Sequence, residues 1–339
     1  MSRGTKPVAE VPSPPPRLRV VDSHTIGEPT RVVVDGVHDL NLDLEPGTVA
    51  ARRDRFRERY DHLRRALVCD PRGAEAMVGV ITLPPSDPTC LLGVIYFNRV
   101  GYLDMCGHAT IGLAVSLGHL ARIEPGPFRL ETPAGIVGVN WHGGPEATFE
   151  CVPPRRIHRG LAIDCGDGGR VTGDVATSGL WFFLCRDHEL PIVPEAIPRL
   201  LERAWSIRRA LDARGISGDR GEVIDHIVLL GPPHDARHHG RAFVLCPDGA
   251  FDRSPCGTAT SALVGCLHED GLLAEGEVWR QESVRGGVYE ASYRIDAGRV
   301  RPAVRGRAWI TAESELHFDP TDPYRLGLPA TASARSHSR

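Results

Sequence analysis

The pattern Cys-Gly-x-Ala-Thr occurs twice in this sequence, as CGHATIG at residues 106–112 and as CGTATSA at residues 256–262. A small, apolar run of helix length follows each copy, and a helix that is hydrophobic on every side is a buried one. Strand-like runs and one long charged helix precede each copy, at 47–67 and at 194–215. Similar segments about 150 residues apart indicate an internal duplication. The chain is therefore predicted to form two similar halves, each with a cysteine at the start of a buried helix.

The predicted halves account for most of the 339 residues. Residues 18–174 form the N-terminal half, which carries Cys106. Residues 175–325 form the C-terminal half, which carries Cys256, with its last strands free to return to the first half. Runs of β-branched residues bounded by Gly and Pro predict mostly antiparallel strands in both halves.

The overall composition excludes several classes of protein. A net charge of −3 gives no basic field for nucleic acid and no attraction to a membrane surface. No apolar run approaches the roughly 18 residues that suggest a membrane span. Residues 1–17 are Pro-rich and lack the apolar core of a signal peptide, and residues 326–339 are polar, so both ends are expected to be flexible tails.

Cysteine and lysine usage narrows the chemistry further. The nine cysteines include no CxxC pair and the chain shows no secretion signal, so we expect reduced thiols and a cytoplasmic location. The only lysine is Lys6, in the N-terminal tail, which leaves no amine for a Schiff base and no lysine for a phosphate-binding P-loop. No GxGxxG motif follows a strand-like run. We therefore expect an activity that needs no cofactor.

Two cysteines at helix N-termini favour one kind of catalysis. The partial positive charge and free N–H groups of a helix N-terminus are expected to lower a thiol pKa and to bind a carboxylate. If the halves face each other, the two thiols lie on opposite sides of one bound carboxylate. Inversion of a stereocentre beside a carboxylate needs a base on one face and an acid on the other. A thiolate and a thiol supply that pair.

Other roles for these residues were weighed against this one. His108 with Cys106 lacks the spacing of common zinc sites, and the His-rich segment 234–239 is expected to be a solvated loop, so no metal is predicted. Asp104 is assigned a local structural role, whereas Asp252 is read as a substrate ligand rather than a helix cap. The remaining seven cysteines are expected to be buried thiols.

The longer motifs around both cysteines resemble the proline racemase superfamily, which includes hydroxyproline 2-epimerases and trans-3-hydroxyproline dehydratases. The resemblance runs from about residue 18 to 315 and rests on MCGHATIG, DRSPCGTATSA, DSHTIGEPTRVV, ETPAGIV, WFFL, DHIVL and VWRQESVRGGVYEAS. It implies an α/β (α+β) fold of two pseudo-symmetric halves, as in diaminopimelate epimerase. Each half is a curved, mostly antiparallel sheet around a central helix, with the active site between the halves.

The resemblance also implies roles for individual residues. Cys106 and Cys256 are the implied acid/base pair. Four residues are implied to bind the substrate carboxylate through backbone N–H groups and nearby side chains: Gly107, His108, Gly257 and Thr258. Asp252 is implied to hold the ring nitrogen, and His226 to contact the ring or its hydroxyl. Without the resemblance, His226 is equally well interpreted as a hydrogen-bonded core histidine.

The implied reaction is inversion of C2 of 4-hydroxyproline, without a cofactor. The 3-hydroxyproline dehydratases carry threonine at the position of Cys256, so a two-base reaction is favoured. Leu180 stands where epimerases carry a polar residue, which keeps two alternatives open: a proline racemase, and a 3-hydroxyproline epimerase or dehydratase. A separate alternative from another class is a non-catalytic amino-acid-binding protein that kept the fold. The expected partner is a small-molecule substrate, with no nucleic acid or membrane, and the chain is expected to be a monomer or homodimer.

Overall fold

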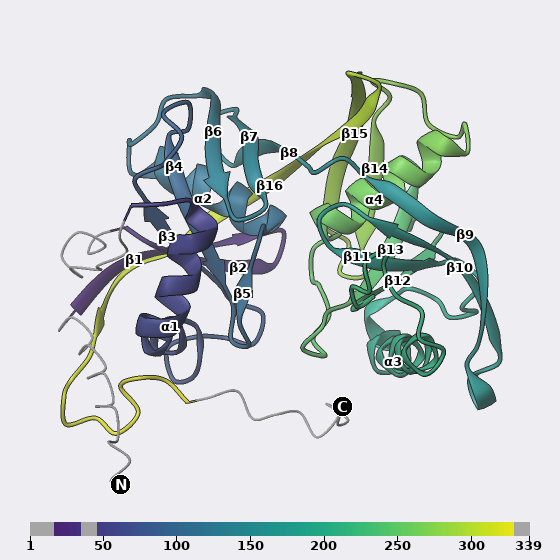
Figure 1. Ribbon diagram of the computed structural model, residues 1–339, viewed down its shortest axis with the longest axis horizontal. Helices are drawn as coiled ribbons and strands as arrows, with labels where there is room; N and C mark the ends of the chain where they lie inside the picture. Colours follow the sequence, from purple (N-terminus) through teal and green to yellow (C-terminus); the bar gives the residue numbers. More distant parts are fainter. Residues whose placement is uncertain (1–16, 35–45, 329–339) are drawn as a thin grey trace, which may run out of the picture.

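The computed structural model describes residues 17–34 and 46–328. The two predicted tails therefore fall outside the described residues, except for Arg17 and residues 326–328. Figure 1 shows two halves side by side, each with one helix inside a curved sheet and one helix outside it. In the described residues, no helix is long and apolar enough to cross a membrane.

The N-terminal half is a closed ring of strands around α2 (Gly107–His119). Its strands pair in the order β1, β2, β3, β4, β6, β7, β8 and β16, and β16 pairs back with β1. Helix α1 (Val49–Val68) packs outside the ring, against β3 and β4. The strands are β1 (Arg17–Thr25), β2 (Glu28–Val33), β3 (Val78–Leu83), β4 (Leu92–Phe97), β5 (Tyr102–Leu103), β6 (Gly126–Thr132), β7 (Gly135–Trp141) and β8 (Glu146–Glu150).

The C-terminal half is an open sheet curved around α4 (Gly257–Glu269), with α3 (Ile197–Ala213) outside it. Its strands pair in the order β9 to β15, followed by the first part of β16. They are β9 (Arg155–Asp164), β10 (Arg170–Thr177), β11 (Trp181–Cys185), β12 (His226–Gly231), β13 (Gly240–Leu245), β14 (Trp279–Ser283), β15 (Val288–Asp296) and β16 (Arg299–His317). Short 3₁₀ turns cover Gly166–Gly168 and Pro194–Ala196.

Strand β16 joins the halves. Its first residues pair with β15, its middle pairs with β8, and its last residues pair with β1 in the N-terminal half. It crosses between the two halves in Figure 1. The end of the chain therefore completes the first ring, and the N-terminal half is built from two separate segments of the chain.

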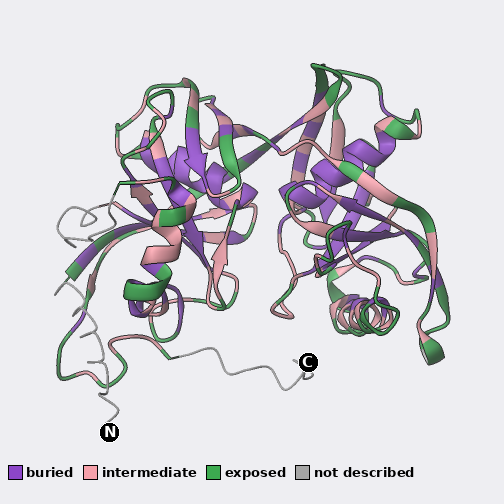
Figure 2. Ribbon diagram, viewed as in Figure 1, coloured by how far each residue is buried: buried purple, intermediate pink, exposed green. Residues whose placement is uncertain are grey.

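The strand directions repeat between the halves. The strands that precede and follow each outer helix in the chain are parallel, β2 to β3 and β11 to β12. Apart from the short β5, the strands that precede and follow each inner helix are parallel as well, β4 to β6 and β13 to β14. Nearly all other neighbours are antiparallel, so the two-half α+β fold expected from the sequence is the observed one. Inner helices α2 and α4 are buried on almost every side, as Figure 2 shows, because their residues are small and apolar.

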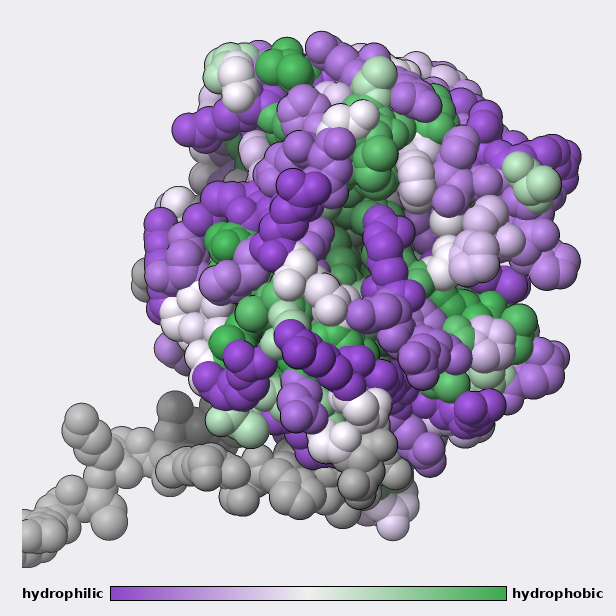
Figure 3. All heavy atoms as spheres, turned by 90° about the vertical axis from the view of Figure 1, so that its right-hand side faces the viewer, coloured by the Kyte–Doolittle hydropathy of each residue, from purple (hydrophilic) through white to green (hydrophobic). Residues whose placement is uncertain are grey.

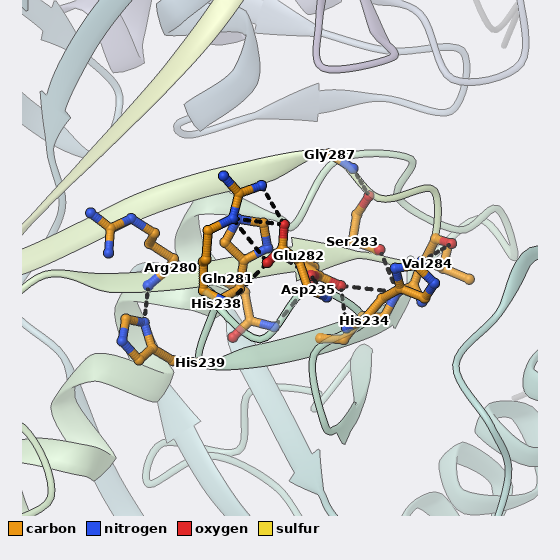
Figure 4. A network of polar contacts seen from close by, with 12 residues as sticks. His234, Asp235, His238, His239, Arg280, Gln281, Glu282, Ser283, Val284 and Gly287 are labelled. Atoms are coloured by element: carbon orange, nitrogen blue, oxygen red, sulfur yellow. Dashed lines mark hydrogen bonds and ion pairs between the residues drawn. The ribbon is translucent and has the colours of Figure 1, made fainter.

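A buried glutamate repeats as well, and the sequence reading missed it. Glu282 of β14 accepts backbone N–H bonds from His234 and Asp235, at 2.9 Å each. It also lies 2.6 Å from Nδ1 of His238 (Figure 4), so the His-rich loop is anchored at His238 rather than fully solvated. In the N-terminal half, Glu131 of β6 accepts the backbone N–H groups of residues 86 and 87 in the same manner. Glu131 thus ties the Pro-Pro-x-Asp loop between β3 and β4 to β6, and Glu282 ties the Pro-Pro-x-Asp loop between β12 and β13 to β14.

The surface of the C-terminal half seen in Figure 3 carries mostly hydrophilic side chains, with hydrophobic ones interspersed among them. The large apolar side chains are concentrated in three clusters, one around both inner helices and one beneath each outer helix. Because one cluster encloses α2 and α4 together, the N-termini of these two helices are held by a common core.

Candidate active site

The N-termini of α2 and α4 open into one cavity of about 380 Å³ between the two halves. Its walls include every site residue expected from the sequence: Cys106, Gly107, His108, His226, Asp252, Cys256, Gly257 and Thr258. Leu180 and Glu28 line it too. Residues far apart in the chain are thus brought to a single space that can hold a small molecule.

Phe149 of β8 lies between the two helix N-termini. A Cβ atom on Gly107 would lie 2.5 Å from Cζ of Phe149, and one on Gly257 would lie 2.6 Å from the same atom. Real Cβ atoms do not approach that closely, so both positions require glycine. One buried ring therefore sets how close the two helices come.

Cys106 is the N-cap residue of α2, with extended backbone (φ −143°), and its side chain is almost fully buried. Its Sγ lies 3.4 Å from Nδ1 of His108. Burial, supported by the negative charges of Asp252 and Glu28, raises the pKa of this thiol to about 12. Hydrogen bonds from the backbone N–H groups of Ala109 and His108 act in the opposite direction and lower the pKa. The expected low thiol pKa is therefore wrong for Cys106, because loss of water outweighs the helix N-terminus.

Cys256 is the N-cap residue of α4 but has a different backbone, with φ +59°. A non-glycine residue in this left-handed region costs about 1–3 kcal/mol and persists only where its surroundings hold it. Its Sγ lies 3.5 Å from Oγ1 of Thr258. Burial, followed by the charge of Asp252, raises the pKa of this thiol well above its usual value.

His108 is held in its neutral form. Burial lowers the pKa of this imidazole to about 3, so at neutral pH it offers one N–H and one lone pair rather than a positive charge. The hydroxyl of Thr25 donates to the carbonyl oxygen of His108 at 2.7 Å, which ties the first turn of α2 to β1.

Asp252 does not cap α4. Its Oδ1 accepts from Sγ of Cys246 at 3.1 Å, and its backbone N–H donates to Val244 at 3.0 Å. Burial raises the pKa of this carboxyl group. The side chain is therefore placed at the cavity wall by the β13 segment and not by the helix that follows it.

His226 begins β12 and is buried beside Phe182, with ring centroids 5.2 Å apart. Its Nδ1 lies 2.7 Å from Oδ1 of Asp225. A carboxylate in this position favours a proton on Nδ1, which leaves Nε2 as a hydrogen-bond acceptor. The same residue is thus a hydrogen-bonded buried histidine and a part of the cavity wall.

Glu28 is a site residue that the sequence reading missed. It opens β2 with only 3% of its surface exposed. Burial, together with the charge of Asp252, raises its pKa to about 8. In the sequence, Glu28 belongs to a Gly-Glu-Pro turn that precedes the β-branched run starting at Thr30, and nothing in this pattern marks the residue as part of a site.

The two halves contribute unlike residues at equivalent places. The pairing of β3 with β2 begins at Val78, and the pairing of β12 with β11 begins at His226, so Val78 and His226 occupy equivalent positions. By the same register, Glu28 on the β2 side is equivalent to Leu180 on the β11 side. All four side chains line the cavity. Each equivalent pair thus combines one polar and one apolar residue, and the pseudo-symmetric cavity has a chemically asymmetric lining.

Asp104 lies at the rim with 60% of its side chain exposed and forms an ion pair with Arg53 of α1. Within residues 17–34 and 46–328, no group of three or more His, Cys, Asp or Glu side chains is arranged to hold a metal ion. Most of the cysteines other than Cys106 and Cys256 are buried, as expected, whereas Cys165 and Cys246 are half-buried.

Sequence comparison finds a matching protein family and relatives that are similar over most of the chain. The sequence profile of the proline racemase family matches residues 20–329. The 4-hydroxyproline 2-epimerase of Xanthomonas campestris pv. campestris is 47% identical over 313 residues, which are 92% of this chain and 99% of the relative. That of Roseibium alexandrii is 45% identical over 312 residues, or 92% and 94%.

Solved structures share the fold. A hydroxyproline epimerase from Agrobacterium vitis, crystallised with bound trans-4-hydroxy-L-proline, superposes with a TM-score of 0.80 at 24% identity and covers 94% of this chain and 97% of its own. A PhzF-family phenazine biosynthesis protein from Bacillus anthracis superposes with a TM-score of 0.63 at 14% identity, over 88% of this chain and 99% of its own.

Proposed function

The chain belongs to the proline racemase family, and we propose that it inverts C2 of 4-hydroxyproline, converting trans-4-hydroxy-L-proline to cis-4-hydroxy-D-proline and back. The observation that carries the proposal is the position of Cys106 and Cys256 on two helix N-termini that open into one cavity. The names of relatives 45–47% identical over 92% of the chain support the choice of substrate.

The proposed reaction is a 1,1-proton transfer between two thiols. One cysteine, as thiolate, removes the proton from C2, and the electron pair of the C–H bond passes into the carboxylate to give an enolate-like intermediate. The other cysteine, as thiol, donates its proton to the opposite face of C2. The first cysteine ends as thiol and the second as thiolate, so the reverse reaction starts from the state that the forward one leaves.

Backbone N–H groups stabilise the charge that develops in this reaction. The first N–H groups of α2 and α4 have no acceptor within their own helix backbone, and they would donate to the substrate carboxylate from the cavity wall. Such fixed donors act on the charge that grows on the carboxylate oxygens. Gly107 and Gly257 allow a close approach to this backbone, and His108 and Thr258 add side-chain hydrogen bonds. The proposal needs no cofactor for any step.

The ring nitrogen has a partner in Asp252. As a carboxylate, Asp252 would accept a hydrogen bond from the positively charged ring nitrogen, and that positive charge would offset the negative charge of Asp252, which adds to burial in raising both thiol pKa values. Substrate binding would thereby lower the pKa of both thiols. His226, through its Nε2 lone pair, would accept a hydrogen bond from the ring hydroxyl.

Leu180 favours a second candidate. It presents an apolar side chain to the cavity at the place equivalent to Glu28, so a ring without a hydroxyl on that side would fit as well. Proline, or a 3-hydroxyproline that is epimerised or dehydrated, is the alternative substrate. A protein that binds the amino acid without catalysis would leave both thiols without a role.

The substrate is tested by chiral analysis of reaction mixtures with proline, 3-hydroxyproline and 4-hydroxyproline. The proposal predicts that kcat/KM is highest for trans-4-hydroxy-L-proline and that the product is its C2 epimer. A higher kcat/KM for proline, or a keto product from trans-3-hydroxy-L-proline, would favour the alternative substrate instead.

A cytoplasmic location and a monomeric or homodimeric state remain predictions.

A further inference from the structure

The carboxyl group of Glu28, in the N-terminal half, contacts the loop of the C-terminal half that carries Cys256. Its Oε2 accepts a hydrogen bond from the backbone N–H of Arg253 at 2.7 Å, between residues 225 positions apart in the chain. The backbone of Ser254 also donates toward this carboxylate. Both donors belong to the short loop between Asp252 and Cys256, so a residue of the N-terminal half holds the loop that carries two residues of the proposed site.

That loop is under conformational strain. Cys256 has a φ of +59°, whereas Cys106 at the equivalent place has ordinary extended backbone. The other backbone hydrogen bonds of the loop lie within the C-terminal half itself: the N–H of Asp252 donates to the carbonyl oxygen of Val244, and the N–H of Thr260 donates to that of Cys256. A strained residue keeps its conformation only when neighbouring contacts fix it. The bond that Glu28 accepts from Arg253 ties this loop to the opposite half.

We propose that Glu28 is a positioning residue that sets Cys256 across the cavity from Cys106. Its hydrogen bond to Arg253 fixes the loop from Asp252 to Cys256 against β2, and β2 belongs to the same ring as α2, which carries Cys106. This role rests on the proposed two-thiol reaction and adds a residue that does not touch the reacting atoms.

The role depends on an acceptor oxygen rather than on a negative charge. Glu28 faces the carboxyl group of Asp252, the buried hydroxyl of Tyr289, the guanidinium of Arg253 and the thiol of Cys106. In these surroundings a carboxylic acid keeps its proton at neutral pH, consistent with its raised pKa of about 8. A neutral acid and an amide share a carbonyl oxygen, so glutamine can replace the acceptor and methionine cannot.

The test compares Glu28→Gln and Glu28→Met by following deuterium exchange at C2 in D2O, starting separately from each C2 epimer of 4-hydroxyproline. Each thiol removes the proton of only one epimer, and the variants C106S and C256S identify which. E28M is expected to show the C256S pattern, with exchange from the epimer served by Cys256 reduced about ten-fold or more relative to exchange from the other. E28Q is expected to stay within about three-fold of the wild type for both epimers.

A matched control separates positioning from general loss of stability. Glu131 is also a buried glutamate of the N-terminal half that accepts backbone N–H bonds, but it does not line the cavity. E131M is expected to lower Tm without changing the ratio of the two exchange rates. If E28M does not fold, Glu28→Asp, which withdraws the oxygens by one methylene group, is expected to shift the same ratio to a smaller extent.

The outcomes distinguish this inference from the proposed function. Wild-type protein that exchanges neither epimer would contradict the two-thiol reaction itself. Two outcomes would overturn only the role of Glu28, provided that the wild type exchanges both epimers. One is that E28M and E28D lose exchange equally for both epimers, and the other is that E28Q is as impaired as E28M.

Discussion

A Cβ atom on Gly107 would lie 2.5 Å from Cζ of Phe149, a fully buried ring that stands equally close to the start of the second inner helix. Overpacking of this kind costs about 1–3 kcal/mol and is relieved by moving backbone or ring. Movement of the backbone changes the distance between the two helix N-termini. The contact therefore connects packing in the core with the geometry of the site.

Gly107→Ala is expected to lower kcat/KM for epimerisation by about ten-fold or more, because a shift of roughly 1 Å at a reacting group is costly. Kinetics of the purified variant with trans-4-hydroxy-L-proline measure this. The double variant G107A/F149L, which removes the obstructing Cζ atom, is expected to recover part of the loss. An active G107A would show that the ring is free to move aside.

Replacement of either thiol by serine is expected to reduce turnover by orders of magnitude, because a serine hydroxyl is a much weaker acid than a cysteine thiol. The measurement is the rate of C2 inversion by C106S and C256S at equal protein concentration. Cys165 is a half-buried cysteine outside the cavity, so C165S serves as the control and should retain wild-type activity. Substantial inversion by C106S or C256S would remove that residue from the proposed mechanism.

Alkylation of Cys106, measured on protein without added substrate, should become faster throughout the range from pH 7 to pH 9.5. Its pKa is raised to about 12, so the reactive thiolate fraction grows by about ten-fold per pH unit in this range and reaches no plateau. Peptide mass spectrometry after brief iodoacetamide treatment measures the modified fraction at each pH. A plateau below pH 9 would mean that the helix N-terminus prevails over burial after all.

The buried glutamates predict how stability depends on pH. Burial acts to raise the pKa of Glu282, but hydrogen bonds from the backbone of Asp235 and His234 lower it below its usual value. A lowered folded-state pKa gives stability that is present above the unfolded-state value of about 4.3 and is lost as pH falls through the folded-state value.

Glu282→Gln should therefore cost about 1–3 kcal/mol of the free energy of unfolding at pH 7, where the carboxylate accepts two backbone bonds. The difference from the wild type should shrink as pH falls below about 4. Urea denaturation at a series of pH values gives both quantities. E131Q, the equivalent change in the other half, should behave alike, and a constant difference at every pH would contradict the argument.

The sequence contains the duplication, and the duplication identifies both catalytic candidates. Two copies of Cys-Gly-x-Ala-Thr, each before an apolar run, suffice to predict Cys106 and Cys256 at the starts of α2 and α4. The order in which strands pair does not follow from periodicity, because each strand presents the same alternation to any neighbour. That β16 crosses to β1 and closes the first ring appears only in the structure.

Other features depend on contacts that no local pattern records. Glu28 and Arg253 are far apart in sequence, and the segment around Glu28 has the composition of an ordinary turn. The raised pKa of Cys106 likewise depends on how completely the fold excludes water, whereas the local pattern reveals only the helix N-terminus that opposes it. Pairwise contacts and burial, unlike motifs, are properties of the assembled core.

The labelling pattern of an early reaction mixture in D2O tests the two-thiol reaction most directly. With trans-4-hydroxy-L-proline as substrate, removal and delivery of the proton by different cysteines predicts cis-4-hydroxy-D-proline with one deuterium at C2, while unreacted substrate stays unlabelled. Chiral separation followed by proton NMR, at less than about a tenth of full conversion, measures the deuterium at C2 of the substrate and of the product separately. Product that keeps the original C2 proton, or substrate labelled as fast as product, would contradict two opposed thiols.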